Sequence, residues 1–258
     1  MAHFSVVIIS LNEERNIGRC LDSVRGLTDD IVVIDSGSTD RTIEICKNKG
    51  ARVIHQPWLG YSAQKNFGHG QASCDFILSL DADEALSEDL RLSISELTGT
   101  PAHLVYEMNR ITNYCGKWIR HCGWYPDQKP RFFDRRIAKW DGAAIHEDLY
   151  VEPGHSRGFL KGDILHYSYY SIADHIQQID LFTEINAIEL FEKGKKVSLF
   201  KLIYCTPVRF IRDYFIQLGL LDGYYGYVIC RLSAEATFLK YLKLKQLNDN
   251  ASHPPKSS

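Results

Sequence analysis

Residues 76–84, Phe-Ile-Leu-Ser-Leu-Asp-Ala-Asp-Glu, decide the fold of the chain. Their first half is short and apolar, which predicts a buried strand over Phe76 to Leu80. Asp81 and Asp83 follow at the C-terminal end of that strand, where open α/β sheets bind their ligands. Carboxylates at such an edge can hold Mg²⁺ or Mn²⁺ and leave positions for water and phosphate oxygens. The alternative interpretation is that both aspartates cap a helix starting near Leu86.

Three further strands are predicted before this stretch. They are runs of β-branched, aliphatic and aromatic residues, which lie at 4–10, 30–34 and 52–55. Helical patterns separate them, and the second of these runs from about Thr42 to Lys49 and stops at Gly50. Strands and helices that alternate at this spacing predict βαβ units and a parallel sheet.

The residues after the second strand suggest a nucleotide site of an unusual kind. The first strand is not followed by Gly-X-Gly-X-X-Gly, and the chain has no Gly-Lys-Ser/Thr phosphate loop. Asp35 could instead accept a hydrogen bond from the imide N–H of a uracil ring. The alternative is a helix start capped by Ser38 or Asp40. Lys65 could reach a diphosphate as a point charge, or could be a solvated lysine on a surface helix.

Four motifs stand in the order found in glycosyltransferase family 2. They are Ser-Leu-Asn-Glu-Glu-Arg-Asn-Ile at 10–17, Val-Ile-Asp-Ser-Gly-Ser-Thr-Asp at 33–40, Gln-Lys-Asn-Phe-Gly at 64–68 and Leu-Asp-Ala-Asp-Glu at 80–84. About the first 100 residues therefore resemble the nucleotide-sugar-binding half of this family. The resemblance implies an α/β GT-A fold with a mostly parallel, Rossmann-like sheet. It also implies a nucleotide-diphospho-sugar donor, a divalent ion (Mg²⁺ or Mn²⁺) and inversion at the anomeric carbon.

The same resemblance implies which residues form the site. The donor would be bound by Asn12, Glu13, Asp35, Ser36, Lys65, Asp81 and Arg131. The metal ion would be held by Asp81, Asp83 and His166. For Arg131 the alternative is an ion pair with Asp134, and for His166 the alternative is a place in the core.

The middle of the chain is predicted to bind the acceptor. Four aromatic residues there could stack on sugar rings or could belong to the core, namely Trp118, Trp124, Tyr125 and Trp140. Family 2 enzymes take their catalytic base from an acidic pair after the metal motif, and His146-Glu147 is similar to that pair. Glu147 is the predicted base that removes the acceptor hydroxyl proton, with Asp148 as the alternative. The segment could also be a charged surface turn.

The C-terminal third has a different character. Residues 193–245 hold 10 Lys/Arg against 3 Asp/Glu, whereas residues 1–192 are acidic. Amphipathic helices are predicted from Ile172 onward, and none has the roughly 20 apolar residues of a membrane span. Basic and aromatic helices of this kind favour the interface of an anionic membrane. The alternative is a helical cap packed on the catalytic domain.

These patterns predict a catalytic domain over 1–170, with a donor half to about 100 and an acceptor half after it. A helical membrane-associating region follows over 171–247, and residues 248–258 are predicted to be a disordered tail. The seven irregularly spaced cysteines indicate reduced thiols in a cytosolic compartment, and the N-terminus does not resemble a signal peptide. The predicted location is peripheral, on the cytoplasmic face of a bacterial inner membrane, and no nucleic acid is expected as a partner.

Over its whole length the chain resembles the bacterial lipopolysaccharide inner-core β-1,4-glucosyltransferases. This resemblance implies transfer of glucose from UDP-glucose to a heptose, with lipid-linked core oligosaccharide as the acceptor. One alternative is a polyprenyl-phosphate sugar synthase or another family 2 transferase that acts on a lipid-linked saccharide. An alternative of another class is a membrane-docked protein that binds nucleotide sugars without turnover.

Overall fold

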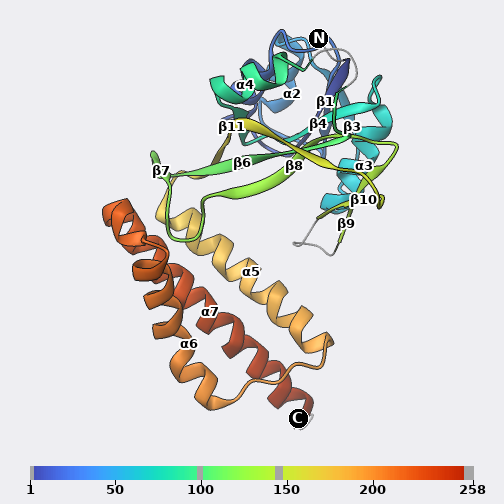
Figure 1. Ribbon diagram of the computed structural model, residues 1–258. Coiled ribbons are helices and arrows are strands. Elements are labelled where there is room, and N and C mark those ends of the chain that lie inside the picture. The colour runs from blue at the N-terminus through green and yellow to red at the C-terminus, as the bar shows by residue number, and fades with distance from the viewer. Residues whose placement is uncertain (1–2, 98–100, 143–147, 253–258) are drawn as a thin grey trace. The chain divides into compact units, whose positions relative to one another are not determined.

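The computed structural model describes residues 3–97, 101–142 and 148–252. The chain folds into two compact units (Figure 1). The first, here called the sheet unit, is Met1–Thr112 with Pro126–Ser168. The second, the helical unit, is Asn113–Tyr125 with Tyr169–Ser258. The predicted division near residue 170 is close to the observed one, but it assigned residues 113–125 to the other part.

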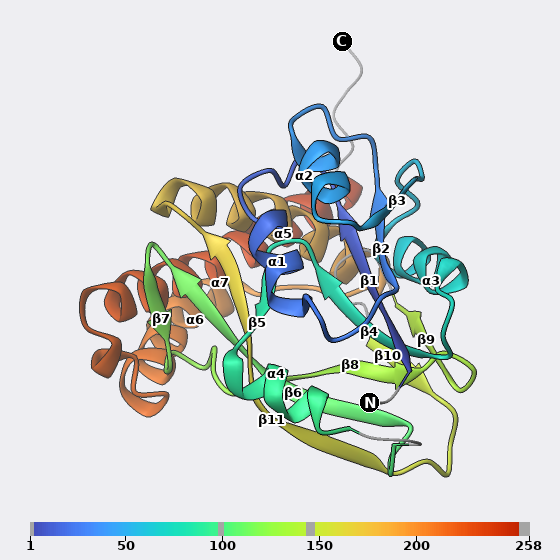
Figure 2. The ribbon, with the colours of Figure 1, turned by 90° about the horizontal axis from the view of Figure 1, so that it is seen from above.

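The N-terminal half of the sheet is parallel, as predicted from the alternation of strands and helices. Its strands are β1 (Phe4–Ser10), β2 (Ile31–Asp35), β3 (Arg52–His55) and β4 (Phe76–Asp81). They stand side by side in the order β3-β2-β1-β4 (Figure 2). In this register Ser10 pairs with Asp35 and Ile9 pairs with Asp81. The polar residues that end these strands therefore meet at one edge of the sheet.

The other half of the sheet is antiparallel, so the prediction of a mostly parallel sheet holds only for the donor half. The full order is β3-β2-β1-β4-β8-β6-β11-β5, with β7 paired to β6. The added strands are β5 (Glu84–Leu86), β6 (Val105–Tyr114), β7 (Lys117–Ile119), β8 (Asp127–Asp134) and β11 (Arg157–Tyr169). A separate two-stranded sheet is formed by β9 (Ala138–Asp141) and β10 (Asp148–Val151).

Helices cover both faces of the parallel strands. The helices are α1 (Ile17–Val24), α2 (Thr42–Asn48), α3 (Tyr61–Gln71) and α4 (Glu88–Ser95). Buried residues of α1, α2 and α4 pack with Val6 and Ile8 on one face. Val7 and Ile9 point to the other face, which holds the β9–β10 sheet and the residue after α3, Ala72. This alternation is the two-residue period of a strand buried on both sides.

Glu84 to Leu86 form strand β5, and the helix predicted near Leu86 follows directly after this strand. Helix α4 begins two residues later, and the Ser87 hydroxyl caps it by accepting from Leu90 N at 3.2 Å. The interpretation of Asp81 and Asp83 as helix caps is therefore wrong. Asp81 is instead the last residue of β4, and Asp83 lies in the two-residue connection to β5, the strand that pairs with β11.

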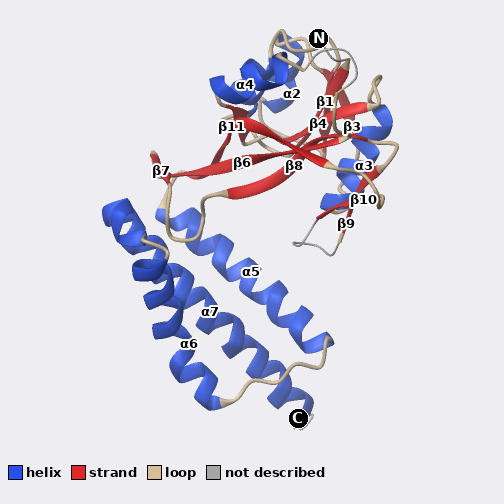
Figure 3. Cartoon of the chain, in the orientation of Figure 1, coloured by secondary structure: helices blue, strands red, loops and turns tan. Residues whose placement is uncertain are grey.

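The helical unit contains three long helices (Figure 3). They are α5 (Ile172–Glu192), α6 (Leu199–Ile211) and α7 (Gly223–Ser252), with a π-helical turn at Arg212–Ile216 and a 3₁₀ turn at Gly219–Asp222 between the last two. Helix α7 continues to Ser252, past residue 248 where the sequence predicted a disordered tail. No helix among the described residues is both long and apolar enough to cross a membrane.

Residues 113–125 belong to the helical unit because they contribute to its core. Tyr114, Ile119 and Cys122 pack with Ile229 and Cys230 of α7 in one buried cluster. Asp222, which is 4% exposed, then fixes the loop, since its carboxylate accepts from His121 N at 2.8 Å and Arg120 N at 3.2 Å. These contacts join segments about 100 residues apart in the chain, and sequence periodicity carries no signal for such pairings.

Candidate functional site

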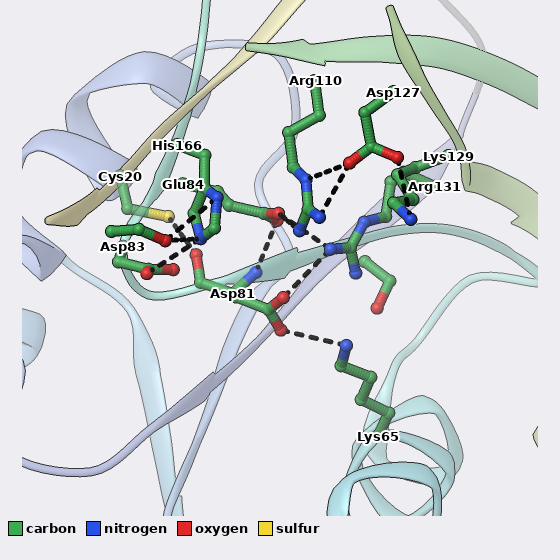
Figure 4. Close-up of polar contacts among 12 residues, drawn as sticks. Cys20, Lys65, Asp81, Asp83, Glu84, Arg110, Asp127, Lys129, Arg131 and His166 are labelled. Carbon is green, nitrogen blue, oxygen red and sulfur yellow. Dashed lines mark hydrogen bonds and ion pairs between the residues drawn. The ribbon is translucent and has the colours of Figure 1, made fainter. Parts of the chain in front are cut away.

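Asp81 is the centre of a buried charge network at the end of β4 (Figure 4). Its two carboxylate oxygens face separate cations, since Lys65 Nζ lies 3.0 Å from Oδ1 and the Arg131 guanidinium 2.9 Å from Oδ2. Lys65 is 1% exposed and Arg131 2%. Burial alone would raise the pKa of Asp81, but Lys65 and Arg131 hold it well below its usual range. Asp81 therefore stays ionised. Arg131 pairs with Asp81 and Glu84, whereas Asp134, its partner in the alternative interpretation, pairs with Arg136.

Glu84 completes this network, and sequence reasoning missed it as a site residue. Its side chain is fully buried and accepts from Arg131 at 2.8 Å, while Arg110 lies 3.4 Å away. The other carboxylate oxygen accepts from Asp81 N at 3.0 Å, which fixes the turn that carries both aspartates. The position of Glu84 in the quoted Leu-Asp-Ala-Asp-Glu motif was the available signal. Arg110, held by Asp127 at 2.8 Å, gave no sequence signal.

Asp83 lies in a different setting from Asp81, although only one residue separates them. Its carboxylate is 3.1 Å from His166 Nε2, and its carbonyl accepts from Tyr167 N at 2.9 Å. Burial would lower the pKa of His166, but Asp83 outweighs that effect and the pKa is raised. The structure thus brings together two of the three residues that the resemblance assigned to a metal ion.

The donor set formed by Asp83 and His166 fits a divalent cation. One carboxylate and one imidazole suit Mn²⁺ and are compatible with Mg²⁺ when water and phosphate oxygens complete the coordination. No group of three or more His, Cys, Asp or Glu residues in the described part of the chain is arranged to hold a metal. The third predicted ligand, Asp81, has both oxygens occupied by Lys65 and Arg131.

Reciprocal hydrogen bonds tie the loops after β1 and β2 together. Asn12 N donates to Ser38 Oγ at 2.8 Å, and Thr39 N donates to Asn12 Oδ1 at 2.8 Å. Asn12 adopts a φ of 54°, a left-handed conformation that Asn tolerates better than most residues. Ser36 lies in the same edge, where its hydroxyl accepts from Gln64 Nε2 at 3.1 Å. The predicted donor residues of these two loops are therefore neighbours.

Asp35 organises its own loop. It is fully buried, and its carboxylate accepts from Gly37 N, Ser38 N, Ser38 Oγ and Ser10 Oγ at 2.5–3.1 Å. A carboxylate has about four acceptor positions. A direct bond to a uracil N–H would require one of these four bonds to open. The structure accordingly gives Asp35 a positioning role in the loop, while Asp40, two residues before α2, accepts from Thr42 N at 2.9 Å.

Glu13 is an unusually basic carboxyl group at the same edge. Burial raises its pKa to about 7, with smaller contributions from the negative charges of Asp83, Asp40 and Asp81. A hydrogen bond from Asn16 Nδ2 at 2.8 Å opposes the shift. Perturbed carboxyl groups of this kind are enriched at functional sites. Glu13 was predicted to contact the donor, and the structure places it within the electrostatic reach of both motif aspartates.

Trp140 forms part of the wall of the charge network. Its ring centroid is 4.7 Å from Lys65 Nζ and 5.6 Å from the Arg131 guanidinium carbon. Its backbone forms two bonds with the Asn66 side chain, at 2.8 and 2.9 Å. With 6% of its surface exposed, Trp140 is a core residue rather than an open sugar-stacking platform. The other three candidate aromatics, Trp118, Trp124 and Tyr125, belong to the helical unit.

Of the two candidate bases, Glu147 lies outside the described residues. Asp148 opens strand β10 and is exposed, and its carboxylate accepts from Leu149 N at 2.8 Å. In the β9–β10 pair Asp148 stands opposite Asp141. An exposed carboxylate at the end of a hairpin is accessible to an acceptor hydroxyl, so the geometry is compatible with Asp148 as the alternative base.

The aspartate pair at the end of β4, beside the loops of two parallel strands, lies where α/β sheets bind their ligands. The Glycosyl transferase family 2 model matches residues 5–158, so the chain belongs to this family and has its GT-A type of α/β fold. The helical unit lies mostly beyond the matched residues.

Relatives of the chain extend over both units. An uncharacterized glycosyltransferase of Rickettsia prowazekii is 31% identical over 96% of this chain and 88% of its own length. The lipopolysaccharide core biosynthesis glycosyltransferase LpsC of Rhizobium meliloti is 28% identical, over 97% of this chain and 94% of its own. Among solved structures, Mycobacterium tuberculosis glucosyl-3-phosphoglycerate synthase overlaps with a TM-score of 0.34 and 29% identity, over 43% of this chain and 44% of that one.

Proposed function

We propose that this protein transfers glucose from UDP-glucose to a heptose of the lipopolysaccharide inner core, with inversion at the anomeric carbon. The observation that carries the proposal is the contrast between the two aspartates after β4. Asp81 is neutralised by Lys65 and Arg131, whereas Asp83, whose side chain is 24% exposed, contacts His166. The likeness to LpsC over nearly the full length of both chains supports a lipopolysaccharide acceptor.

On the donor side, the buried cations prepare the site for a diphosphate. Lys65 and Arg131 are held in place by ion pairs with Asp81 and Glu84, so their positions are fixed before a ligand arrives. Fixed charges in a water-poor site stabilise the charge that develops on a leaving diphosphate. Asp83 and His166 would hold the divalent ion, which supplies further charge neutralisation there when bound. The paired loops with Asn12, Glu13 and Ser36 would receive the nucleoside.

On the acceptor side, Glu147 would take the proton from the attacking heptose hydroxyl, with Asp148 as the alternative. An inverting transfer needs one such base, because the hydroxyl attacks as the bond to the leaving diphosphate breaks. The base must therefore approach the face of the sugar opposite the diphosphate. Asp148 opens strand β10, and Glu147 precedes it directly in the sequence, about 65 residues after Asp81 and Asp83.

The helical unit would dock the enzyme on the anionic membrane that carries its acceptor. Helix α6 and the π-helical turn after it expose a ridge of large apolar side chains, here called the α6 ridge, at Leu199, Phe200, Ile203, Val208, Ile211, Phe215 and Ile216. Phe200 is 73% exposed and Ile203 74%. Exposed Lys195 and Lys196 precede the ridge, and the segment as a whole is basic. Apolar insertion beside basic residues is the chemistry of peripheral helices on anionic lipid.

A transfer assay tests this function directly. Purified protein is incubated with UDP-glucose and a lipopolysaccharide whose core ends at the inner heptose, with Mn²⁺, with Mg²⁺ or with EDTA. The expected result is release of UDP and addition of one hexose with a divalent ion, and neither in EDTA. Binding of UDP without any turnover in all three conditions would contradict the proposal and favour a protein that binds nucleotide sugars without transfer.

A further inference from the structure

Helices α5 and α7 meet along a seam whose composition is unusual. Small or polar side chains line this seam, namely Gln178, Thr183 and Asn186 on α5, and Ser233, Thr237 and Lys240 on α7, beside the apolar Ile179, Phe182 and Ala236. Thr183 and Asn186 on α5, and Ser233, Thr237 and Lys240 on α7, recur three or four residues apart, so on each helix they share one face. Packed helices normally put large apolar residues on that face. Here a cavity of about 250 Å³ opens instead.

The cavity is positively charged. Its lining includes Arg209 and Lys240 and no carboxylate. Among the described residues Lys240 has no carboxylate partner and contacts the Tyr241 ring, with Nζ 4.9 Å from its centroid. Arg209 shares the single carboxylate of Asp213 with Arg212, so one positive charge of that cluster is uncompensated. His175 adds none near neutral pH, because burial lowers its pKa to about 4.

The hydroxyl groups of the seam are arranged to accept hydrogen bonds from a ligand. Thr183 Oγ1 donates to the Asp180 carbonyl at 3.0 Å, and Thr237 Oγ1 donates to the Ser233 carbonyl at 3.0 Å. Each hydroxyl has one proton, so these bonds leave its lone pairs as the groups available to the cavity. The lining therefore combines cationic donors, which suit a phosphate, with oxygen acceptors, which suit ligand hydroxyls.

We propose that this cavity binds a phosphorylated polyol, a phosphate ester that also carries hydroxyl groups. Its volume equals that of about eight water molecules at roughly 30 Å³ each, which is room for one sugar- or glycerol-sized unit. The proposal rests on the proposed function, because this chemistry is shared by phosphate-bearing saccharides of lipid-linked acceptors and by head groups of anionic phospholipids. Polar side chains that line a cavity inside a helix pair are the kind of local departure from apolar packing that marks function.

Calorimetric titration of the full-length protein tests the cavity with three soluble probes, namely glycerol 3-phosphate, inorganic phosphate and glycerol. Glycerol 3-phosphate should bind with the highest affinity, and glycerol should not bind detectably. Lys240→Gln should weaken binding of both phosphates about tenfold, the scale of one charged hydrogen bond. Lys245→Gln is the matched control, since Lys245 lies on the same helix, outside the cavity, paired with Asp249. Thr237→Val should weaken the binding of glycerol 3-phosphate and leave the affinity for inorganic phosphate unchanged.

Two further arms separate the sources of the ligand. If the natural ligand is the acceptor, Lys240→Gln raises the KM for the glycolipid and leaves kcat unchanged. If it is a phospholipid head group, the same variant loses affinity for phosphatidylglycerol vesicles and keeps its KM.

The proposal is overturned if the wild-type protein does not bind glycerol 3-phosphate, or if Lys240→Gln and Lys245→Gln bind it equally. UDP is titrated into the same samples. If UDP still binds but the cavity test fails, only the cavity proposal is contradicted. If UDP does not bind but the cavity test succeeds, only the proposed function is contradicted.

Discussion

The two units of this chain treat charged and apolar side chains in opposite ways. In the sheet unit, buried charges are matched, since Lys65 and Arg131 face Asp81 and Glu84 at 2.8–3.0 Å. In the helical unit, large apolar side chains such as Phe200 are exposed, and basic residues outnumber acidic ones. A matched, buried network is organised in advance for a small ligand of defined charge. An exposed apolar and basic surface gains its stabilisation only when something larger covers it.

The largest expected effect is at Asp83. Asp83→Ala should abolish transfer and metal-dependent donor binding, because it removes the carboxylate that would hold the cation, while the stability of the protein stays near that of the wild type. The measurement is the hexose-transfer assay together with urea unfolding. Full activity of Asp83→Ala in EDTA would exclude the metal role.

Asp81→Ala should also lose transfer, because it disrupts the buried charge network of the sheet unit. It removes the carboxylate that lies 3.0 Å from the buried Lys65 Nζ and 2.9 Å from the Arg131 guanidinium. A broken buried pair typically costs 3–5 kcal/mol of unfolding free energy, and about 3 kcal/mol is expected here because Asp81 is itself 26% exposed. Urea unfolding of the two alanine variants side by side measures the difference. Equal stabilities would contradict the assignment of Asp81 to the charge network.

Glu147→Gln should keep donor binding and lower turnover by about 10²–10⁴-fold, the usual contribution of a positioned base. Glutamine preserves the shape of the side chain and removes the proton acceptor. Asp148→Asn is the matched variant one residue away. If the loss appears in Asp148→Asn alone, Asp148 is the base, and if neither variant loses turnover, an already ionised acceptor such as a polyprenyl phosphate becomes the better candidate.

The α6 ridge should control membrane affinity. The double variant Phe200→Ser/Ile203→Ser should bind anionic vesicles about 10–100-fold more weakly, since each buried large apolar side chain contributes roughly 1.5–3 kcal/mol and insertion is partial. Leu92→Ser/Phe159→Ser is the control, because both residues are about half exposed, at 52% and 51%, but belong to the sheet unit. Vesicle sedimentation at low and high salt measures both. If full-length wild-type protein stays in the supernatant with anionic vesicles at low salt, the membrane proposal fails.

The smallest expected effect concerns Glu13 and pH. The pKa of Glu13 is raised to about 7 in the folded protein, above its unfolded value, so the ionised form disfavours folding. Unfolding free energy should therefore fall as pH rises from about 5 to 7, by roughly 1–3 kcal/mol. His166 adds a loss of the same sign, because its pKa is also raised. Glu13→Gln should remove only the part of this pH dependence that Glu13 contributes. Urea unfolding in EDTA at pH 5 and pH 8 measures that part. Identical pH dependence in the variant and the wild type would contradict the shift.

The parts of the fold and of the candidate site that depend on local sequence patterns could be predicted from the sequence. The parallel strands and the edge with Asp35, Asp81 and Asp83 follow from short-range periodicity and from where strands end. Arg110 and the antiparallel strands could not be predicted, because they depend on pairings between distant segments. Asp35 shows a further limit, since its residue type permits uracil binding and loop organisation alike, and only the four observed hydrogen bonds reveal that its acceptor positions are used.

The most direct test of the central claim is mass spectrometry of the core oligosaccharide from cells that lack this protein. The account predicts a core that is lighter by the inner-core hexose and by any residues attached to it. Restoring the wild-type gene should recover the full mass, whereas restoring the Asp83→Ala form should not. A core of unchanged mass in cells without the protein would contradict a role in lipopolysaccharide assembly.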